Sequence, residues 1–144
     1  MASAAPVVPP WRLELPWTSR TATIEIGNET IAAEIADTGP LRERGLGYRD
    51  GLKPGTGMLF VYDSPGPRSF WMKGMRFCLD IVWIESGQIV GAAEDVCPVP
   101  GASDADLPVY QSPEPVRWVL ELPAGWLAEH GYSAGTPVKI DLPS

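Results

Sequence analysis

The stretch from Gly57 to Glu94 constrains the fold more than any other part of the sequence. It contains four apolar runs, at residues 57–62, 69–74, 79–84 and 88–93. Gly, Pro, Asp and Ser residues separate these runs, a pattern that is typical of consecutive antiparallel strands. We therefore expect these four strands to lie side by side in one sheet, with Ser86 and Gly87 forming the turn between the last two.

The flanking segments predict more strands and two short helices. Residues 21–27 and 30–36 predict a hairpin, and residues 116–122 and 137–142 predict two later strands. A helix of about two turns should start after Asp37 or Thr38, with Pro40 in its first turn, and end at Gly45 or Gly47. A second helix should end at Gly131.

Turn-forming residues are frequent, because 16 of the 144 residues are Pro and 15 are Gly. This frequency favours many short strands over long helices. We predict an all-β, jelly-roll-like antiparallel sandwich or barrel with two short helices. Residues 1–19 should form a flexible tail, residues 20–144 a single domain, and the Pro-rich segment 96–115 a long loop that could form the rim of a site.

Charge and hydropathy exclude several classes of partner. The formal net charge is −7, and the 11 Lys and Arg residues are scattered, whereas nucleic-acid binding needs a concentrated basic face. No apolar run is long enough to span a bilayer. Residues 1–17 lack the charged and apolar regions of an intact signal peptide, but their Ala, Ser and Pro content suits the tether after a removed one. We expect an extracytoplasmic monomer, periplasmic or at the cell surface.

Two cysteines, Cys78 and Cys97, allow one disulfide. With a two-residue turn at Ser86 and Gly87, Cys78 would lie opposite Asp95, and Cys97 would be its diagonal neighbour. Diagonal Cα atoms lie ~7–8 Å apart, too far for a disulfide unless the register slips or a bulge intervenes. We therefore expect two free, buried thiols; a disulfide would instead support export.

The residues themselves resemble a known family. Arg42-Glu43-Arg44-Gly45-Leu46, Gly57-Met58-Leu59-Phe60, Phe70-Trp71-Met72-Lys73, Leu79-Asp80-Ile81 and Val119-Leu120-Glu121-Leu122, in this order, resemble the DUF192 family of uncharacterised bacterial and archaeal proteins. The resemblance runs from about residue 24 to residue 142. It implies a jelly-roll-like β fold that is frequently exported or lipid-anchored, and no established activity. Two positions depart from the family pattern: Gly74 replaces an Asn, and Cys78 replaces a Pro.

Asp80 is the first candidate site residue. Alternation along its strand places its carboxylate on an apolar face with Val82 and Ile84. A buried carboxylate must be paired or protonated. We expect it to pair with an arginine of the 42–49 helix, as a structural salt bridge or as part of a site.

The strand around Trp71 is the second candidate. Alternation places Phe70 and Met72 on one face and Trp71 and Lys73 on the other. Trp71 and Lys73 could therefore line a ligand-binding face, with Trp83 or Trp118 as neighbours, although burial on both faces is an alternative.

Three arginines, Arg42, Arg44 and Arg49, should project from the first helix. A guanidinium group suits a carboxylate or phosphate ligand, but an internal partner such as Asp80, Glu94 or Glu121 is also expected. Asp104 and Asp106 could hold Ca²⁺, although the complete calcium-loop pattern is missing. With one His, no CxxC pair and no Gly-rich phosphate loop, we expect neither a metal nor a cofactor.

Three functional hypotheses follow. The first is a non-catalytic binding module of the cell envelope for a small polar, saccharide or peptide ligand. The second is a hydrolase that uses Asp80 with Glu94 or Glu121 as paired carboxylates. The third is a purely structural or interaction module. The candidate ligand-binding residues are Arg42, Arg49, Trp71, Lys73, Asp80 and Glu121.

Overall fold

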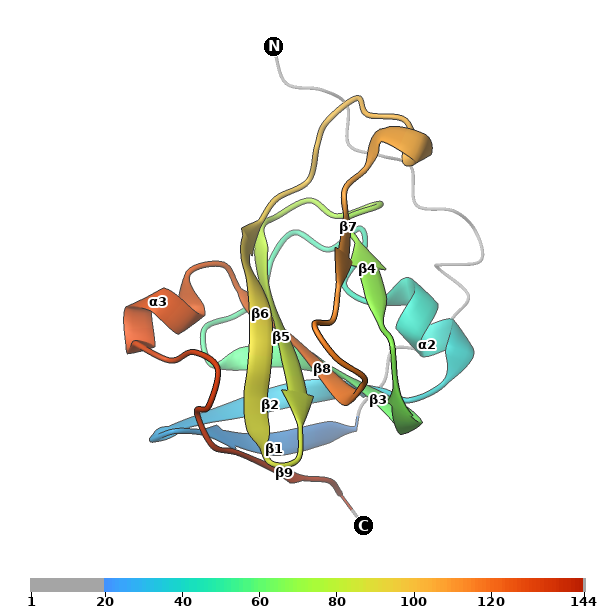
Figure 1. Ribbon diagram of the computed structural model, residues 1–144. Coiled ribbons are helices and arrows are strands. Elements are labelled where there is room, and N and C mark those ends of the chain that lie inside the picture. Colours follow the sequence, from blue (N-terminus) through green and yellow to red (C-terminus); the bar gives the residue numbers. More distant parts are fainter. Residues whose placement is uncertain (1–19, 144) are drawn as a thin grey trace.

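A computed structural model describes residues 20–143 and shows a mostly β protein with short helices, as predicted (Figure 1). The proposed tail at residues 1–19 lies outside the described residues. Seven strands form the main sheet: β1 (Thr21–Ile26), β2 (Glu29–Ala36), β3 (Thr56–Gly66), β5 (Leu79–Glu85), β6 (Gln88–Val96), β8 (Val116–Pro123) and β9 (Val138–Asp141). Their order across the sheet is β6-β5-β8-β3-β2-β1-β9. The β1–β2 hairpin is confirmed, whereas β2 and β3 run parallel and so depart from the antiparallel sheet that we predicted.

The main sheet curls into a half-barrel whose two edge strands meet at one end. A bridge between Gln88 and Pro137 joins β6 to the start of β9, and the Ile89 and Gly135 backbones bond beside it. One hydrophobic cluster lies inside the curl, where Val82 and Ile84 of β5 pack with Ile24 of β1. A second cluster covers the opposite face of the sheet. The centre of the sheet, including β5, is therefore buried on both faces, whereas β1 has alternate residues exposed.

Two short helices flank the sheet, as predicted (Figure 1). Helix α2 (Gly39–Arg44) begins after Thr38, whose Oγ1 accepts the Leu41 N–H at 3.2 Å, and it ends at Gly45. Helix α3 (Trp126–His130) ends at Gly131, which adopts a left-handed conformation. The start of α2 and the end of α3 thus follow ordinary capping rules. No helix in the described part is long and apolar enough to cross a membrane.

The order of strands corrects our expectation for residues 57–94. Strand β8 lies between β3 and β5, although it comes last of the three in sequence. Strand β4 (Ser69–Trp71) leaves the main sheet and pairs with β7 (Val109–Gln111) in a separate two-stranded sheet. The predicted row of four neighbouring strands is therefore wrong. In this position the Phe70 ring packs edge-on against Phe60 and Trp83 of the main sheet.

The expectation of two free thiols is also wrong, because Cys78 and Cys97 form a disulfide. Strand β6 carries two register shifts against β5, one beside Trp83 and one beside Asp80. Each shift adds one residue to β6, so Leu79 pairs with Val96 and the two cysteines come opposite each other. Their Cα atoms lie 4.1 Å apart. Strand β6 thus contains the bulges that allow two diagonal neighbours to form a disulfide.

Asp80 has a different partner from the one that we predicted. Its Oδ1 accepts the N–H groups of Asp95 at 2.9 Å and Gly125 at 3.1 Å, and its Oδ2 accepts that of Leu127 at 3.0 Å. The side chain is 0% exposed and faces the inner cluster, as the alternation predicted. Helix α2 lies over the other face, so the predicted pair with an arginine is wrong. Asp80 instead joins the β6 bulge to the first turn of α3.

Replacing Asp80 by Asn should destabilise the fold by about 2–3 kcal/mol, because an amide NH₂ would face backbone donors in a buried site. Urea denaturation should show a lower midpoint for Asp80→Asn. Asp141→Asn, at an exposed position of β9, is the matched control and should leave the midpoint unchanged. Equal midpoints for the two variants would contradict this role of Asp80.

Removing the disulfide should lower the free energy of unfolding by about 3 kcal/mol, the usual value for a closed loop of this length; the cysteines are 19 residues apart. The measurement compares wild type with Cys78→Ala/Cys97→Ala in urea, with and without a reductant. Reductant should lower the wild-type midpoint and leave the double variant unaffected. A wild type that is insensitive to complete reduction would contradict the prediction.

Candidate functional site

A pocket of about 190 Å³ lies between α2, β3 and β4, on the outer face of the main sheet. It brings together four of the six predicted site residues: Arg42, Trp71, Lys73 and Glu121. The side chains of Arg44, Tyr62 and Phe70 also line it. Its volume is below the ~300–1,000 Å³ that is usual for drug-sized ligands, so it suits one sugar ring or one amino-acid-sized group.

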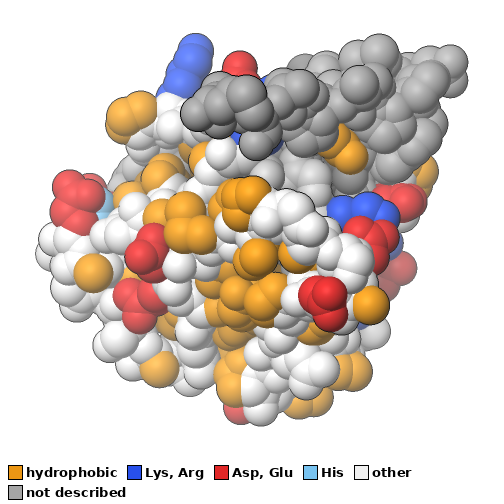
Figure 2. Space-filling model, turned by 90° about the horizontal axis from the view of Figure 1, so that it is seen from above, with side chains coloured by type: hydrophobic (Ala, Val, Ile, Leu, Met, Phe, Trp, Pro, Cys, Tyr) orange, Lys and Arg blue, Asp and Glu red, His pale blue; other side chains and the backbone are white. Residues whose placement is uncertain are grey.

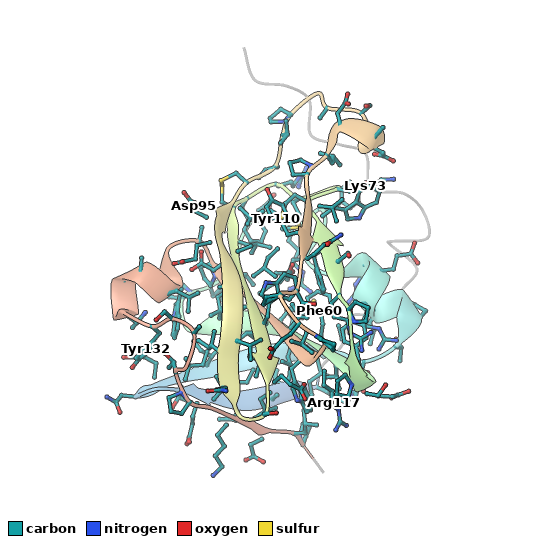
Figure 3. The ribbon with its side chains drawn as sticks, in the orientation of Figure 1. Phe60, Lys73, Asp95, Tyr110, Arg117 and Tyr132 are labelled. Atoms are coloured by element: carbon teal, nitrogen blue, oxygen red, sulfur yellow. A yellow bond between two sulfur atoms is a disulfide. The ribbon has the colours of Figure 1, made fainter. Side chains whose placement is uncertain are left out.

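Strand β4 supplies one wall of the pocket. Phe70 and Met72 turn toward the outer cluster, while Trp71 stays 45% exposed, so the predicted alternation is confirmed. The Lys73 Nζ lies 5.3 Å from the centre of the Trp71 ring and 2.7 Å from Asp104 of the 3₁₀ helix η1 (Asp104–Asp106). Lys73 is thus at the end of β4 nearest to η1 (Figure 3). This wall presents an accessible indole beside an ammonium group.

Trp83 does not join this wall, contrary to one of our expectations. It is 2% exposed and packs in the outer cluster beneath Phe70. Trp118 is half-buried and packs against the inner cluster, on the other face of the sheet. Of the tryptophans in residues 20–143, Trp71 is therefore the one that lines the pocket.

Helix α2 supplies the second wall. Arg42 donates from Nη1 to the Val61 carbonyl at 2.8 Å, and its guanidinium carbon lies 4.9 Å from the centre of the Tyr62 ring. Arg44 is only 2% exposed, so our expectation that it would project outward is wrong. Arg44 is the last residue of the six-residue helix, directly before the C-cap Gly45. Two guanidinium groups consequently border one small cavity.

Glu121 contributes a carboxyl group to the pocket from β8. It pairs in register with Met58 of β3 and Ile81 of β5, both in the outer cluster. The residue is 5% exposed, and burial raises the pKa of its carboxyl to about 8. The group is therefore neutral at pH 7 and can both donate and accept a hydrogen bond. Burial likewise raises the pKa of the neighbouring Tyr62.

The other two predicted residues, Arg49 and Asp80, lie outside this pocket. Arg49 forms a two-pronged salt bridge with Glu34 of β2, with Nη2 3.0 Å from Oε1. Its partner is thus none of the three acids that we expected. Asp80 pairs with Leu122 in register, one position away from Glu121 on β8, and so faces the opposite side of the sheet.

This arrangement contradicts the paired-carboxylate hypothesis. The sheet itself separates Asp80 from Glu121. Glu94 is exposed, whereas the Asp80 carboxylate is fully buried and accepts three backbone N–H groups. A glycosidase-like mechanism needs two carboxyl groups that face the same cleft. Neither predicted pair meets that requirement.

A second groove, of about 520 Å³, adjoins the first. The two share Lys73 and Met75, and the far wall of the second is the 98–107 segment. Gly74 lies in this groove with φ +74°, and its carbonyl accepts the Tyr48 N–H at 2.8 Å. Asn is the residue that best replaces Gly in such a left-handed conformation. The departure from the family pattern at position 74 is therefore explained by the backbone.

The acidic loop does not gather its carboxylates around a common point. Asp104 pairs with Lys73, and Asp106 accepts a hydrogen bond from the Ser103 hydroxyl at 2.9 Å. Among the described residues, one group of three side chains has the spacing of metal ligands: Cys78, Asp95 and Cys97. A metal ion binds cysteine as a thiolate. Here the two sulfur atoms are bonded to each other in the disulfide.

Arg44 and Tyr62 are among the pocket residues that were not in the predicted set of six. Arg44 had been expected on the helix surface, and Tyr62 had been treated only as the end of a strand. A signal for Tyr62 does exist in the sequence, because alternation along β3 places it on the same face as Met58 and Phe60. Glu121 follows the same rule, since it shares a face with Val119.

Glu121→Gln should change how stability depends on pH. Because the folded-state pKa lies above the usual value of 4.5, the folded protein binds more protons than the unfolded chain between these values, and stability falls as the pH rises. The wild type should lose on the order of 3 kcal/mol more than Glu121→Gln between pH 5 and pH 8. Urea midpoints measured across this range test it, and parallel curves would contradict the raised pKa.

Comparisons with known proteins agree with the fold. The DUF192 family, described as an uncharacterized ACR, matches residues 22–140. A structure from Sinorhizobium meliloti 1021, described as a candidate transcription regulator, has a TM-score of 0.74 and 30% identity, covering 88% of this chain and 97% of that one. A protein of unknown function from Novosphingobium aromaticivorans DSM 12444 has a TM-score of 0.72 and 25% identity, with 83% of each chain covered. No curated protein matches. With nearly all of its described residues matched by the family model, the chain belongs to the DUF192 family.

Proposed function

We propose that this protein is a non-catalytic binding module of the cell envelope and that its ligand is a small polar molecule, a saccharide or a peptide end. The observation that carries this proposal is the pocket beside Trp71, where an indole 45% exposed stands next to a cavity of about 190 Å³. An aromatic face packs against the apolar side of a sugar ring or a peptide, while polar groups nearby fix its orientation.

The polar groups of the pocket suit recognition better than catalysis. A neutral Glu121 carboxyl at the base can donate to one hydroxyl and accept from another. Arg42, bound to the Val61 carbonyl and stacked over Tyr62, is held in place before a ligand arrives. Among the described residues that line the cavity, the other carboxyl group belongs to Glu43, which is exposed on α2.

The disulfide supports the proposed location. Disulfides persist in oxidising compartments and are rare where thiols are kept reduced. Cys78 and Cys97 lie beside the groove that adjoins the pocket, so an oxidising environment would help to hold the 98–107 wall in position. We therefore place the protein in the periplasm or at the cell surface, and we propose that it acts as a monomer.

The relative described as a candidate transcription regulator suggests a second function, contact with DNA. The acidity of this chain does not favour it. With a net charge of −7, the protein would meet the phosphate backbone with net repulsion.

Binding to a combined glycan and peptide array tests the proposed function. Trp71→Ala should reduce binding of any recognised ligand at least ten-fold, because it removes the aromatic wall. Val109→Ala is the matched control: Val109 is the cross-strand partner of Trp71, is 55% exposed and does not line the pocket. Loss of binding in both variants, or no ligand that depends on Trp71, would contradict the proposal.

A further inference from the structure

Glu121 is a buried acid to which the fold gives no hydrogen-bonding partner. On the face shown in Figure 2, acidic side chains stand at the surface around a central group of hydrophobic ones. Glu121 is instead 5% exposed, and within residues 20–143 no hydrogen bond or salt bridge reaches its carboxyl group. The other buried acid, Asp80, accepts three backbone N–H groups. Since Glu121 lines the cavity beside Trp71, a ligand in that cavity can supply the missing partner.

The surroundings of this carboxyl group keep it neutral. Its register partners, Met58 and Ile81, belong to the outer hydrophobic cluster. A carboxylate buried among apolar side chains without a paired cation is strongly disfavoured, so the group retains its proton. Burial is also what raises the pKa of Glu121 to about 8. At pH 7 the side chain therefore presents one O–H donor and one carbonyl acceptor, side by side in one plane.

The cationic groups at the border of the cavity already have partners. Arg42 donates to the Val61 carbonyl. Lys73 pairs with Asp104, and Arg44 takes part in an interaction of its own. The walls between these groups are apolar or aromatic and come from Leu46, Phe60, Phe70, Trp71 and Met75. A charged ligand, or one with many hydroxyl groups, would leave polar atoms unpaired against these walls, which costs free energy.

A cyclic amide matches this arrangement of groups. An open-chain peptide bond is trans and directs its N–H and C=O apart, whereas the ring of a lactam holds the two on the same side. A protonated carboxyl group can donate to that carbonyl and accept from that N–H at once. Resting on the proposed function, we infer that the pocket binds a small neutral lactam and that the Glu121 carboxyl recognises its amide through two hydrogen bonds. The face of the ring lies on Trp71.

The affinity for such a ligand depends on the proton of Glu121. An ionised carboxyl group has no donor left and meets the ligand carbonyl with like polarity. With a pKa of about 8, about one tenth of the molecules keep this proton at pH 9, so the affinity falls about ten-fold. Burial raises the pKa of Tyr62, which also lines the cavity and stays protonated in this range. The charged and titratable groups around the cavity are Arg42, Glu43, Arg44, Tyr62, Lys73 and Glu121.

Titrations of the whole protein, followed by NMR chemical shifts, test the inference with three probes that share a six-membered ring. The first is δ-valerolactam, the second its N-methyl derivative, which lacks the N–H, and the third δ-valerolactone, in which an oxygen replaces the N–H. The lactam should bind at least five-fold more tightly than the other two at pH 6, because each of them leaves the Glu121 carbonyl without a donor. Equal affinities, or no binding of the lactam, would overturn the inference.

Variants of Glu121 assign the preference to its carboxyl group. Glu121→Leu should abolish the difference between the lactam and its N-methyl derivative. Glu121→Gln keeps a donor beside an acceptor, so it should restore the difference and remove its dependence on pH between 6 and 9. Glu94→Gln, which removes a carboxylate at an exposed position of β6 outside the pocket, should behave as wild type. A lactam preference that persists in Glu121→Leu would overturn the inference.

The array experiment separates failure of this inference from failure of the proposed function. If the lactam shows no preference that depends on Glu121, while the array yields a ligand that depends on Trp71, the inference fails alone. If neither the array nor the lactam titration yields a ligand whose binding Trp71→Ala weakens, the proposed function fails, and the inference fails with it.

Discussion

The buried carboxylate of Asp80 joins three separate elements of this structure: its own strand β5, the β6 bulge and the start of α3. A carboxylate with no water around it must receive hydrogen bonds. Here the donors come from the β6 bulge at Asp95 and from Gly125 and Leu127 at the start of α3. The bulge shifts the register of β6, and that shift brings Cys78 opposite Cys97. The disulfide and the position of α3 thus both depend on one side chain.

The two buried acidic residues of the main sheet lie on opposite faces. Asp80 and Glu121 come from neighbouring positions of paired strands, but the pleat directs them to opposite sides. The inner one meets backbone donors and is structural. The outer one opens into a cavity that also contains Arg42 and Trp71. Two buried acids in adjacent strands therefore have unrelated roles, and this separation is what removes the hydrolase hypothesis.

Local patterns in the sequence predicted the elements well, because strands, turns and caps depend on neighbouring residues. Thr38 and Gly45 bound α2 as predicted, and the alternation at Phe70 and Trp71 was confirmed. The order of strands could not be predicted in the same way, since the insertion of β8 between β3 and β5 depends on contacts between residues far apart. The register shifts in β6 have no strong local signal either, and the expectation of free thiols failed for that reason.

In the candidate site, too, the features that depend on neighbouring residues were predicted and those that depend on distant contacts were not. Alternation correctly predicted that Trp71 lies on the face opposite Phe70 and Met72, and the structure shows that this face is accessible. The burial of Arg44 could not be predicted in this way, because a helix of six residues is too short to show a periodicity. The partner of Arg49 was missed because Glu34 belongs to a hairpin that the sequence does not place next to the helix.

The central position of β8 has a consequence for biosynthesis. Strands β3 and β5 both take their hydrogen-bonding partner from residues 116–123, so a nascent chain that ends before this segment has two long apolar strands without their common neighbour. Non-local pairing of this kind delays the rate-limiting step of folding. The polypeptide consequently remains in an unfinished state until most of its length has left the ribosome, and a chaperone or translocation apparatus would have that whole interval in which to capture it.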